Sequence, residues 1–138
     1  MKPEPTKQQV PDVVPINGGT WLICGGRDFT GQAMFDAAMH DLCARFGMPS
    51  KVVHGNARGA DRMADEWGVR SAIPVFRYPA DWNAHGRAAG PLRNQKMLDE
   101  AKPSLVVAFP GGRGTADMVR RARDAGVSVV EIGAKEAV

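Results

Sequence analysis

Short apolar runs alternate with helical patterns along most of this 138-residue chain, and this alternation constrains its fold more than any other feature. Apolar runs predict five strands, at residues 20–24, 51–54, 73–78, 105–109 and 128–132. Helical spacing predicts four helices between them, at residues 32–46, from 60 onward, at 91–101 and from about 115 to 125. Apolar strands that alternate with helices are typical of a parallel sheet covered on both faces. We therefore predict a doubly wound α/β fold with five parallel strands in the order 3-2-1-4-5.

The chain divides into a short N-terminal arm and one domain. Four prolines within residues 1–19 disfavour helix and central strand, so this segment is predicted to be a flexible arm. Residues 20–138 are long enough for a single domain with a full core. Apolar runs fall far short of the roughly 20 residues that span a membrane, and the N-terminus lacks the apolar segment of a secretory signal. We expect a cytoplasmic protein without a membrane partner.

The stretch from Leu105 to Val119 carries the strongest functional pattern. An apolar strand runs into the glycine-rich turn Pro110, Gly111, Gly112, Arg113 and Gly114, and a helix follows, with Thr115 as its expected cap. Backbone N–H groups at such a helix start, together with the helix dipole, favour an anion. The three glycines are expected to let the backbone approach a ligand closely and to supply positive φ angles. The pattern predicts a phosphate-bearing ligand, and a tight strand-to-helix turn without a ligand is the alternative.

The predicted strand order places two further turns next to this one. Strands 1 and 4 lie side by side at the switch point of the sheet, where open α/β sheets bind ligands. The residues expected to bind there lie in the turns after strands 1 and 2 or at the end of strand 2: Gly25, Gly26, Arg27, Asp28, His54, Gly55, Arg58, Gly59 and Asp61. Asp28 can alternatively cap the turn in which it lies.

Four further side chains are candidates for the same site. Arg93 near a helix start conflicts with the helix dipole, which favours a phosphate contact over an ordinary surface position. Asn94 follows it in sequence. Asp117 lies in the first turn of a predicted helix, where it can stabilise the dipole, bind a sugar hydroxyl or act as a general base. Trp82 lies in the long segment 79–90 and can stack on a base or pack against the domain.

Other classes of site find little support. Neither a dinucleotide-binding G-x-G-x-x-G nor a P-loop is present, and no Cys/His cluster has zinc spacing, so no metal and no cofactor are expected. Cys24 and Cys43 are expected to be buried reduced thiols, with Cys24 close enough to strand 1's end to approach the ligand. The net charge of +3 and the few aromatic residues argue against a nucleic-acid partner. The basic run Arg120, Arg121 and Arg123 is interpreted as a solvated helix face.

Four ordered motifs resemble those of the SLOG superfamily, in its YspA/YpsA-related branch, over about residues 20–132. They read C-G-G-R-D-F at 24–29, H-G-x-A-R-G-A-D at 54–61, G-P-x-R-N-x-x-M at 90–97 and F-P-G-G-x-G-T at 109–115. The resemblance implies a Rossmann-like fold that binds a nucleotide or a nucleotide derivative. The superfamily includes LOG enzymes, which release a base from a nucleoside 5′-monophosphate, and DprA, which binds single-stranded DNA.

The match to LOG enzymes is partial. Arg93 and Met97 match their R-K-x-x-M segment, where Asn94 replaces the lysine, and Asp117 stands at the glutamate of their P-G-G-x-G-T-x-E segment. The resemblance implies a homodimer that holds the 5′-phosphate on residues 111–115, with Arg93 and Asp117 as catalytic residues if it hydrolyses the N-glycosidic bond. A non-catalytic sensor of a nucleotide signal and a DprA-like module for single-stranded DNA are the alternatives.

Overall fold

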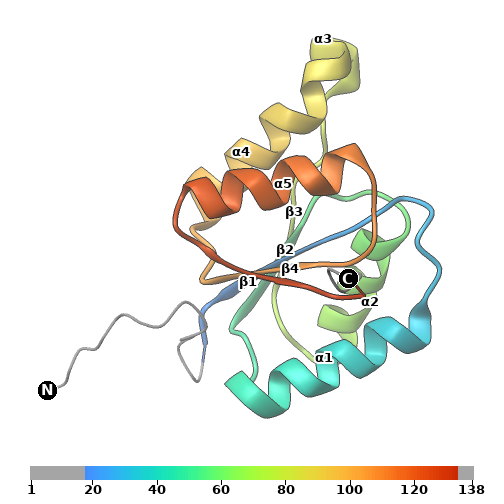
Figure 1. Ribbon diagram of the computed structural model, residues 1–138, viewed down its shortest axis with the longest axis vertical. Coiled ribbons are helices and arrows are strands. Elements are labelled where there is room, and N and C mark those ends of the chain that lie inside the picture. The colour runs from blue at the N-terminus through green and yellow to red at the C-terminus, as the bar shows by residue number, and fades with distance from the viewer. Residues whose placement is uncertain (1–17, 134–138) are drawn as a thin grey trace, which may run out of the picture.

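A five-stranded parallel sheet forms the centre of the molecule, as the sequence predicts. The computed structural model describes residues 18–133 (Figure 1). Its strands are β1 (Thr20–Cys24), β2 (Lys51–His54), β3 (Val75–Arg77), β4 (Leu105–Ala108) and β5 (Ser128–Glu131). All neighbouring strands are parallel and their order is β3-β2-β1-β4-β5. This arrangement confirms the predicted α/β, Rossmann-like fold.

Helices cover both faces of this sheet. One face carries α1 (Gln32–Phe46) and α2 (Ala60–Arg70), and the opposite face carries α4 (Ala89–Ala101) and α5 (Arg113–Asp124) (Figure 1). A short helix, α3 (Trp82–His85), and the 3-10 turn η1 (Gly86–Ala88) precede α4. No helix in residues 18–133 has the length and apolar character that a membrane crossing requires.

Side chains of the central strands alternate between two cores. Trp21 and Ile23 of β1 pack with Phe35 and other residues on the α1 and α2 side. Leu22 and Cys24 of the same strand pack on the α4 and α5 side. Because successive strand residues point to opposite faces, a strand buried on both faces must be apolar at nearly every position. This requirement explains the continuous apolar run that predicts β1.

Two segments differ from the sequence-based expectation. The third strand is restricted to Val75–Arg77 because β3 is an edge strand, and its central Phe76 is 45% exposed. The segment 79–90, expected to be irregular, contains α3 and η1, and the Asp81 side chain caps α3 by accepting a hydrogen bond from the Ala84 N–H at 3.0 Å. The predicted N-terminal arm lies largely outside the described residues, because the description begins at residue 18.

The start of α5 also differs. Thr115 is not its cap, because α5 begins at Arg113 and Gly112 occupies the capping position without a side-chain hydrogen bond. The first-turn N–H groups of α5 are therefore not satisfied by a capping side chain.

Gly59 holds α2 against the turn that follows β1. Its φ angle of +78° is in the left-handed region, and a Cβ atom there would collide with the backbone carbonyl oxygens of Gly26 and Arg27. The next residue, Ala60, donates its N–H to the carbonyl oxygen of Gly26 at 3.2 Å. Only glycine meets both the conformational and the steric requirement at this position.

We predict that Gly59→Ala lowers the free energy of unfolding by about 3 kcal/mol, because it combines an unfavourable φ angle with a backbone collision. Gly114→Ala is the matched control, since a Cβ at Gly114 meets nothing within 4 Å, and its position in α5 favours alanine by up to about 1 kcal/mol. Urea denaturation followed by circular dichroism measures both. Equal stability of the two variants would contradict this role of Gly59.

Candidate functional site

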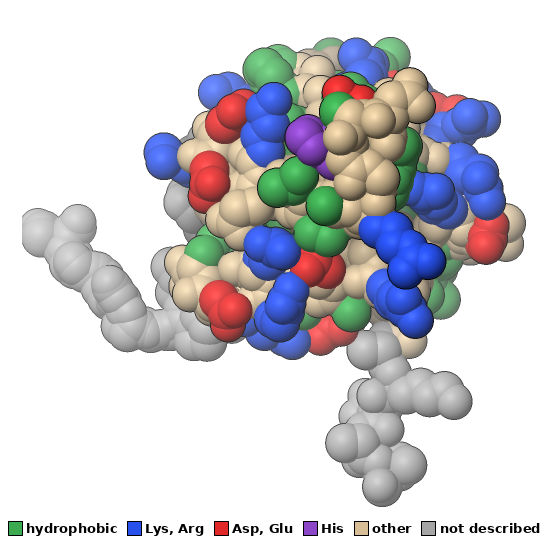
Figure 2. Space-filling view, turned by 90° about the horizontal axis from the view of Figure 1, so that it is seen from above, with side chains coloured by type: hydrophobic (Ala, Val, Ile, Leu, Met, Phe, Trp, Pro, Cys, Tyr) green, Lys and Arg blue, Asp and Glu red, His purple; other side chains and the backbone are tan. Residues whose placement is uncertain are grey.

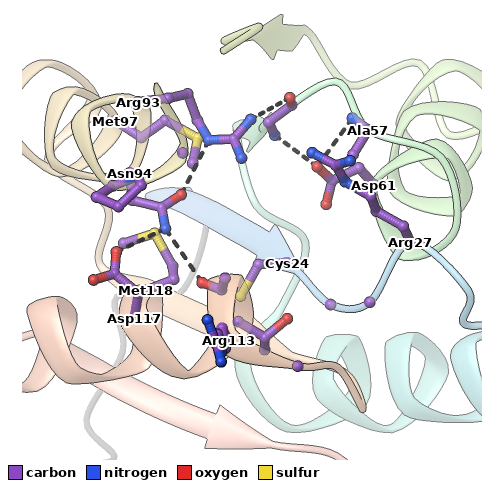
Figure 3. Close-up of a pocket in the computed structure, with 18 of the residues that line it drawn as sticks. Cys24, Arg27, Ala57, Asp61, Arg93, Asn94, Met97, Arg113, Asp117 and Met118 are labelled. Atoms are coloured by element: carbon purple, nitrogen blue, oxygen red, sulfur yellow. Dashed lines mark hydrogen bonds between the residues drawn. The ribbon is translucent and has the colours of Figure 1, made fainter. Parts of the chain in front are cut away.

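The turns after β1, β2 and β4 meet at one end of the sheet. The Gly26 N–H donates to the Pro110 carbonyl oxygen at 2.9 Å, and this hydrogen bond joins the turn after β1 to the turn after β4. A pocket of about 610 Å³ lies at this point, between these turns and the first residues of α4 and α5 (Figure 3). This is the switch point of the sheet, where the neighbours of β1 lead into crossovers on opposite faces.

Residues from four separate predicted motifs line this pocket together. Those among the predicted site residues are Gly25, Gly26, Arg27, Gly55, Asp61, Arg93, Asn94, Gly112, Arg113, Gly114, Thr115 and Asp117. The remaining predicted residues lie outside its lining: Asp28, His54, Arg58, Gly59, Pro110 and Gly111. The structure therefore brings the four motifs together at one pocket, but only some residues of each motif line it.

The glycine turn before α5 leaves space in front of the helix start. A Cβ on Gly112 or Gly114 would meet nothing within 4 Å, whereas a Cβ on Gly111 would collide with Thr115 and with the backbone nitrogen of Gly26. Gly111 thus packs closely against the backbone of the turn after β1, within the protein itself. The expected positive φ angles are wrong, since none of these three glycines has one. Gly112 and Gly114 leave the backbone bare on the side of the pocket, where an anion can reach the N–H groups.

Arg93 from α4 reaches across the pocket with its guanidinium fixed in place. Its Nη1 donates to the carbonyl oxygens of Gly55 at 2.5 Å and Tyr78 at 3.3 Å, and its Nε donates to Asn94 Oδ1 at 3.0 Å (Figure 3). These three acceptors are all neutral, and Arg93 has no ion pair among residues 18–133. Burial lowers the pKa of Arg93, and Asp61 acts in the opposite direction. The guanidinium is thus a half-buried cation that lacks a bonded carboxylate within residues 18–133.

Asn94 connects α4 with α5 instead of presenting its amide to the pocket. Its Nδ2 donates to the Gly114 carbonyl oxygen at 3.2 Å and to Asp117 Oδ2 at 3.0 Å, while its Oδ1 accepts from Arg93. The side chain is 4% exposed. Both ends of the amide are therefore occupied by the protein, and Asn94 sets the positions of Arg93 and of the first turn of α5.

Asp117 lies at the centre of a cluster of cations and donors. Its two carboxylate oxygens accept from Asn94, from Arg120 at 2.5 Å and from Arg121 at 2.8 Å. Burial acts to raise the pKa of Asp117, but the hydrogen bonds from Arg121, Asn94 and Arg120 together outweigh it and lower the pKa. The carboxylate is consequently charged at neutral pH and bound to protein donors on both oxygens. Arg120 and Arg121, predicted to form a solvated face, have this specific structural role.

Asp61 forms the floor of the pocket on the side of β2. Its Oδ2 accepts the backbone N–H groups of Gly55 at 3.1 Å and Ala57 at 3.2 Å, which closes the turn after β2. The side chain is 5% exposed, and burial raises its pKa although Ala57, His54, Arg93 and Gly55 act to lower it. Asp61 therefore shapes the turn that carries Gly55, against which Arg93 packs.

His54 and Arg58 interact with other side chains. The His54 ring is 1% exposed, its Nε2 lies 2.8 Å from Asp65 Oδ1, and its Nδ1 accepts the Asn56 N–H at 2.9 Å. This pattern places the proton on Nε2, which donates to Asp65. Arg58 pairs with Asp28 at 3.1 Å on the surface. An adjacent smaller cavity of about 350 Å³ includes Arg58 in its lining.

Arg87, Met97 and Met118 line the pocket although the sequence does not place them there, whereas Trp82 and Cys24 are considered there as neighbours of the ligand. Trp82, Arg87, Met97 and Met118 also face the pocket, and Cys24 lies beneath it with a thiol whose pKa is raised by burial. The Arg27 guanidinium stacks on the Trp82 ring at 4.9 Å from its centroid. The sequence does not predict Arg87 as a site residue, because its position depends on the path of α3 and η1. Met97 and Met118 lie on the helix faces that also form the core, so their spacing cannot distinguish the two roles.

The surface chemistry of the described residues bears on two other kinds of ligand, metal ions and nucleic acids. Within residues 18–133, no group of three or more His, Cys, Asp or Glu side chains could hold a metal ion. Basic side chains on the face shown in Figure 2 occur in separate groups, with acidic and hydrophobic side chains between them. A nucleic-acid groove would instead need a continuous basic track with stacking aromatics.

Two comparisons with known proteins agree with this architecture. The family model of the YspA, cpYpsA-related SLOG family matches residues 22–85. The Gene 61 protein of Mycobacterium phage D29 is 39% identical over 121 residues, which cover 83% of this chain and 96% of the phage protein. The match therefore includes β1, β2 and the turns that form one wall of the pocket. On this evidence the chain belongs to the YspA, cpYpsA-related SLOG family.

Proposed function

We propose that this protein binds a nucleotide-like ligand in the switch-point pocket, with a phosphate at the first turn of α5. The observation that carries this proposal is that two anion-attracting groups, the start of α5 and the Arg93 guanidinium, face each other across the pocket. Gly112 and Gly114 leave the start of α5 open, and Arg93 faces it from α4 without a carboxylate partner in residues 18–133 (Figure 3). Family membership supports a nucleotide-related ligand over a simple inorganic anion.

The rest of the pocket suits the other parts of a nucleotide. Trp82 is 46% exposed and lines the cavity, which gives a base an aromatic surface on which to stack. Asp117 also lines it and offers charged oxygens to a ribose hydroxyl. The volume of about 610 Å³ is within the range of small-molecule sites. In this arrangement Arg93 contacts the phosphate or the ribose.

Binding without hydrolysis is the function that the site supports best. A general base works most efficiently when its pKa lies near the working pH. The pKa of Asp117 is lowered instead, and Asn94, Arg120 and Arg121 occupy both oxygens. LOG-like release of a base is therefore the second candidate, supported by the motif around Asp117 and opposed by its hydrogen bonds. A DprA-like function in binding single-stranded DNA has weaker support, because the basic side chains on the face shown in Figure 2 are interrupted by acidic and hydrophobic ones.

We predict that nucleoside 5′-monophosphates bind the protein and change the fluorescence of Trp82, which lines the pocket. Arg93→Ala should lower the affinity for the tightest-binding monophosphate at least tenfold, because charge-assisted hydrogen bonds are lost. Arg70→Ala is the matched control, since Arg70 is an exposed arginine in the last turn of α2. Fluorescence titration and calorimetry measure the affinities, and Trp82→Phe identifies the source of the signal. Failure of every monophosphate to bind, or full binding by Arg93→Ala, contradicts the proposal.

We also predict that the bound nucleoside monophosphate is recovered intact. Prolonged incubation with the purified protein, followed by chromatography of bases and nucleotides, should give no release of free base above the buffer control. Release of base by the wild type that disappears in Asp117→Asn would establish the hydrolase instead. Tight binding in the calorimeter together with an unchanged nucleotide would favour the sensor.

Asp117 gives a prediction for stability as a function of pH. Because its folded-state pKa lies below the ordinary value of 3.8, Asp117 stabilises the fold at neutral pH and loses this contribution as the pH falls below about 3.8. Asp117→Asn should cost about 1 kcal/mol at pH 7, and the difference from wild type should shrink at pH 3. Asp36→Asn is the control, because Asp36 is exposed and, within residues 18–133, accepts a side-chain hydrogen bond from Gln32 alone. Urea denaturation at both pH values checks this, and a constant difference would contradict it.

A further inference from the structure

The arginines of this protein fall into two groups according to their partners. Those with an ion pair among residues 18–133 all lie outside the lining of the large pocket: Arg45, Arg58, Arg77, Arg120, Arg121 and Arg123. The four arginines that line the pocket have no ion pair within the same residues: Arg27, Arg87, Arg93 and Arg113. Arg62 and Arg70 of α2 also lack an ion pair within residues 18–133 and lie outside this lining. Four of the six unpaired guanidinium groups of these residues are thus in one cavity.

Carboxylates of the pocket do not offset this charge. Asp61 and Asp117 are the acidic side chains in its lining. Asp117 already binds Arg120 and Arg121 outside the pocket, so it has little charge left to attract the lining arginines. Asp61 remains as the balancing carboxylate, and it is 5% exposed beneath the turn after β2. The pocket therefore carries a net positive charge. One phosphate monoester, with a charge of about −1.5 to −2 at neutral pH, does not neutralise it.

The positive groups also lie on two opposite walls. Arg113 belongs to the first turn of α5, on the wall proposed to hold the phosphate. Arg27 and Arg93 extend toward each other on the other wall, from the turn after β1 and from α4 (Figure 3). They are close enough that Arg27 acts, after burial, to lower the pKa of Arg93. Trp82 supports Arg27 through its ring, and Arg87 follows from η1.

We propose that the ligand carries a second anionic group, and that Arg27 and Arg87 bind it on the wall opposite the α5 turn, while Arg93 contacts both anionic groups. This inference rests on the proposed function and deepens it, because it assigns the ligand to nucleotides with two or more phosphates. A monophosphate at the α5 turn leaves Arg27 without an anionic partner, whereas a second phosphate between Arg27 and Arg93 reduces their mutual repulsion and satisfies the free N–H donors of Arg27. The guanidinium geometry suits bidentate contacts with phosphate oxygens.

Calorimetric titration of the full chain tests this inference with two series of probes. The nucleotides are the 5′-mono-, di- and triphosphates of adenosine and of guanosine, and the base-free pair is inorganic phosphate and pyrophosphate. Wild-type protein should bind the diphosphate of the preferred base at least tenfold more tightly than its monophosphate. Pyrophosphate should likewise bind more tightly than phosphate. Raising the salt concentration should weaken binding of the diphosphate more than binding of the monophosphate, because the diphosphate carries more charge to be screened.

Three variants locate the second subsite. Arg27→Ala and Arg87→Ala change exposed side chains, so the fold should persist, and thermal melting checks this. Each should weaken the diphosphate by about tenfold and the monophosphate by less than about threefold, so that the preference falls. Arg70→Ala removes the same charge from an exposed position on α2, outside the pocket lining, and should leave the preference unchanged.

The outcomes separate the two proposals. Equal affinity of the wild type for mono- and diphosphate overturns the second subsite and leaves the nucleotide-binding function standing. A preference for the diphosphate that persists in both Arg27→Ala and Arg87→Ala also overturns it, because the preference then arises elsewhere. Absence of binding by every nucleotide overturns both proposals. A diphosphate preference that falls in both variants and persists in Arg70→Ala supports the second subsite.

Discussion

The backbone of Gly26 holds together the three turns on which the rest of the site depends. Its N–H donates to the Pro110 carbonyl oxygen in the turn after β4, and its own carbonyl oxygen accepts the N–H of Ala60 at the start of α2. A Cβ at Gly26 would lie 3.0 Å from both the Cα of Gly111 and the Pro110 oxygen. The turn after β1 thus fits between the turns after β2 and β4 only because Gly26 has no side chain. The pocket forms where these backbones converge.

The sequence predicts the sheet well because burial on both faces leaves a simple pattern. The bounds of β1 and α1 agree with the predicted 20–24 and 32–46, since an apolar run and a helical repeat each end at glycine or proline. Prediction fails where exposure weakens the pattern, as at the edge strand β3. It also fails in segment 79–90, where a single side-chain contact from Asp81 to the Ala84 N–H starts α3.

The site is predictable at the level of motifs and not at the level of individual contacts. Parallel strands bring their carboxyl ends to one edge, so glycine turns after β1, β2 and β4 must meet. The partners of Asn94 and Asp117 come from helices α4 and α5, and their contact depends on how these helices pack. Sequence spacing gives no measure of that packing. Residues that look available for a ligand, such as His54 and Asn94, are therefore found to be occupied within the protein.

The fixed guanidinium of Arg93 has a consequence for the thermodynamics of association. Immobilising a long side chain at a binding site costs about 0.5 to 1.5 kcal/mol of conformational entropy. For Arg93 this loss occurs on folding, because Gly55, Tyr78 and Asn94 already restrict its rotamers. Arg27, Arg87 and Arg113 are exposed and retain rotamer freedom that a ligand must remove. The cavity thus combines one preorganised cation with adaptable ones, so Arg93 contributes affinity at the lowest entropic cost while the others adjust to the length of the anion.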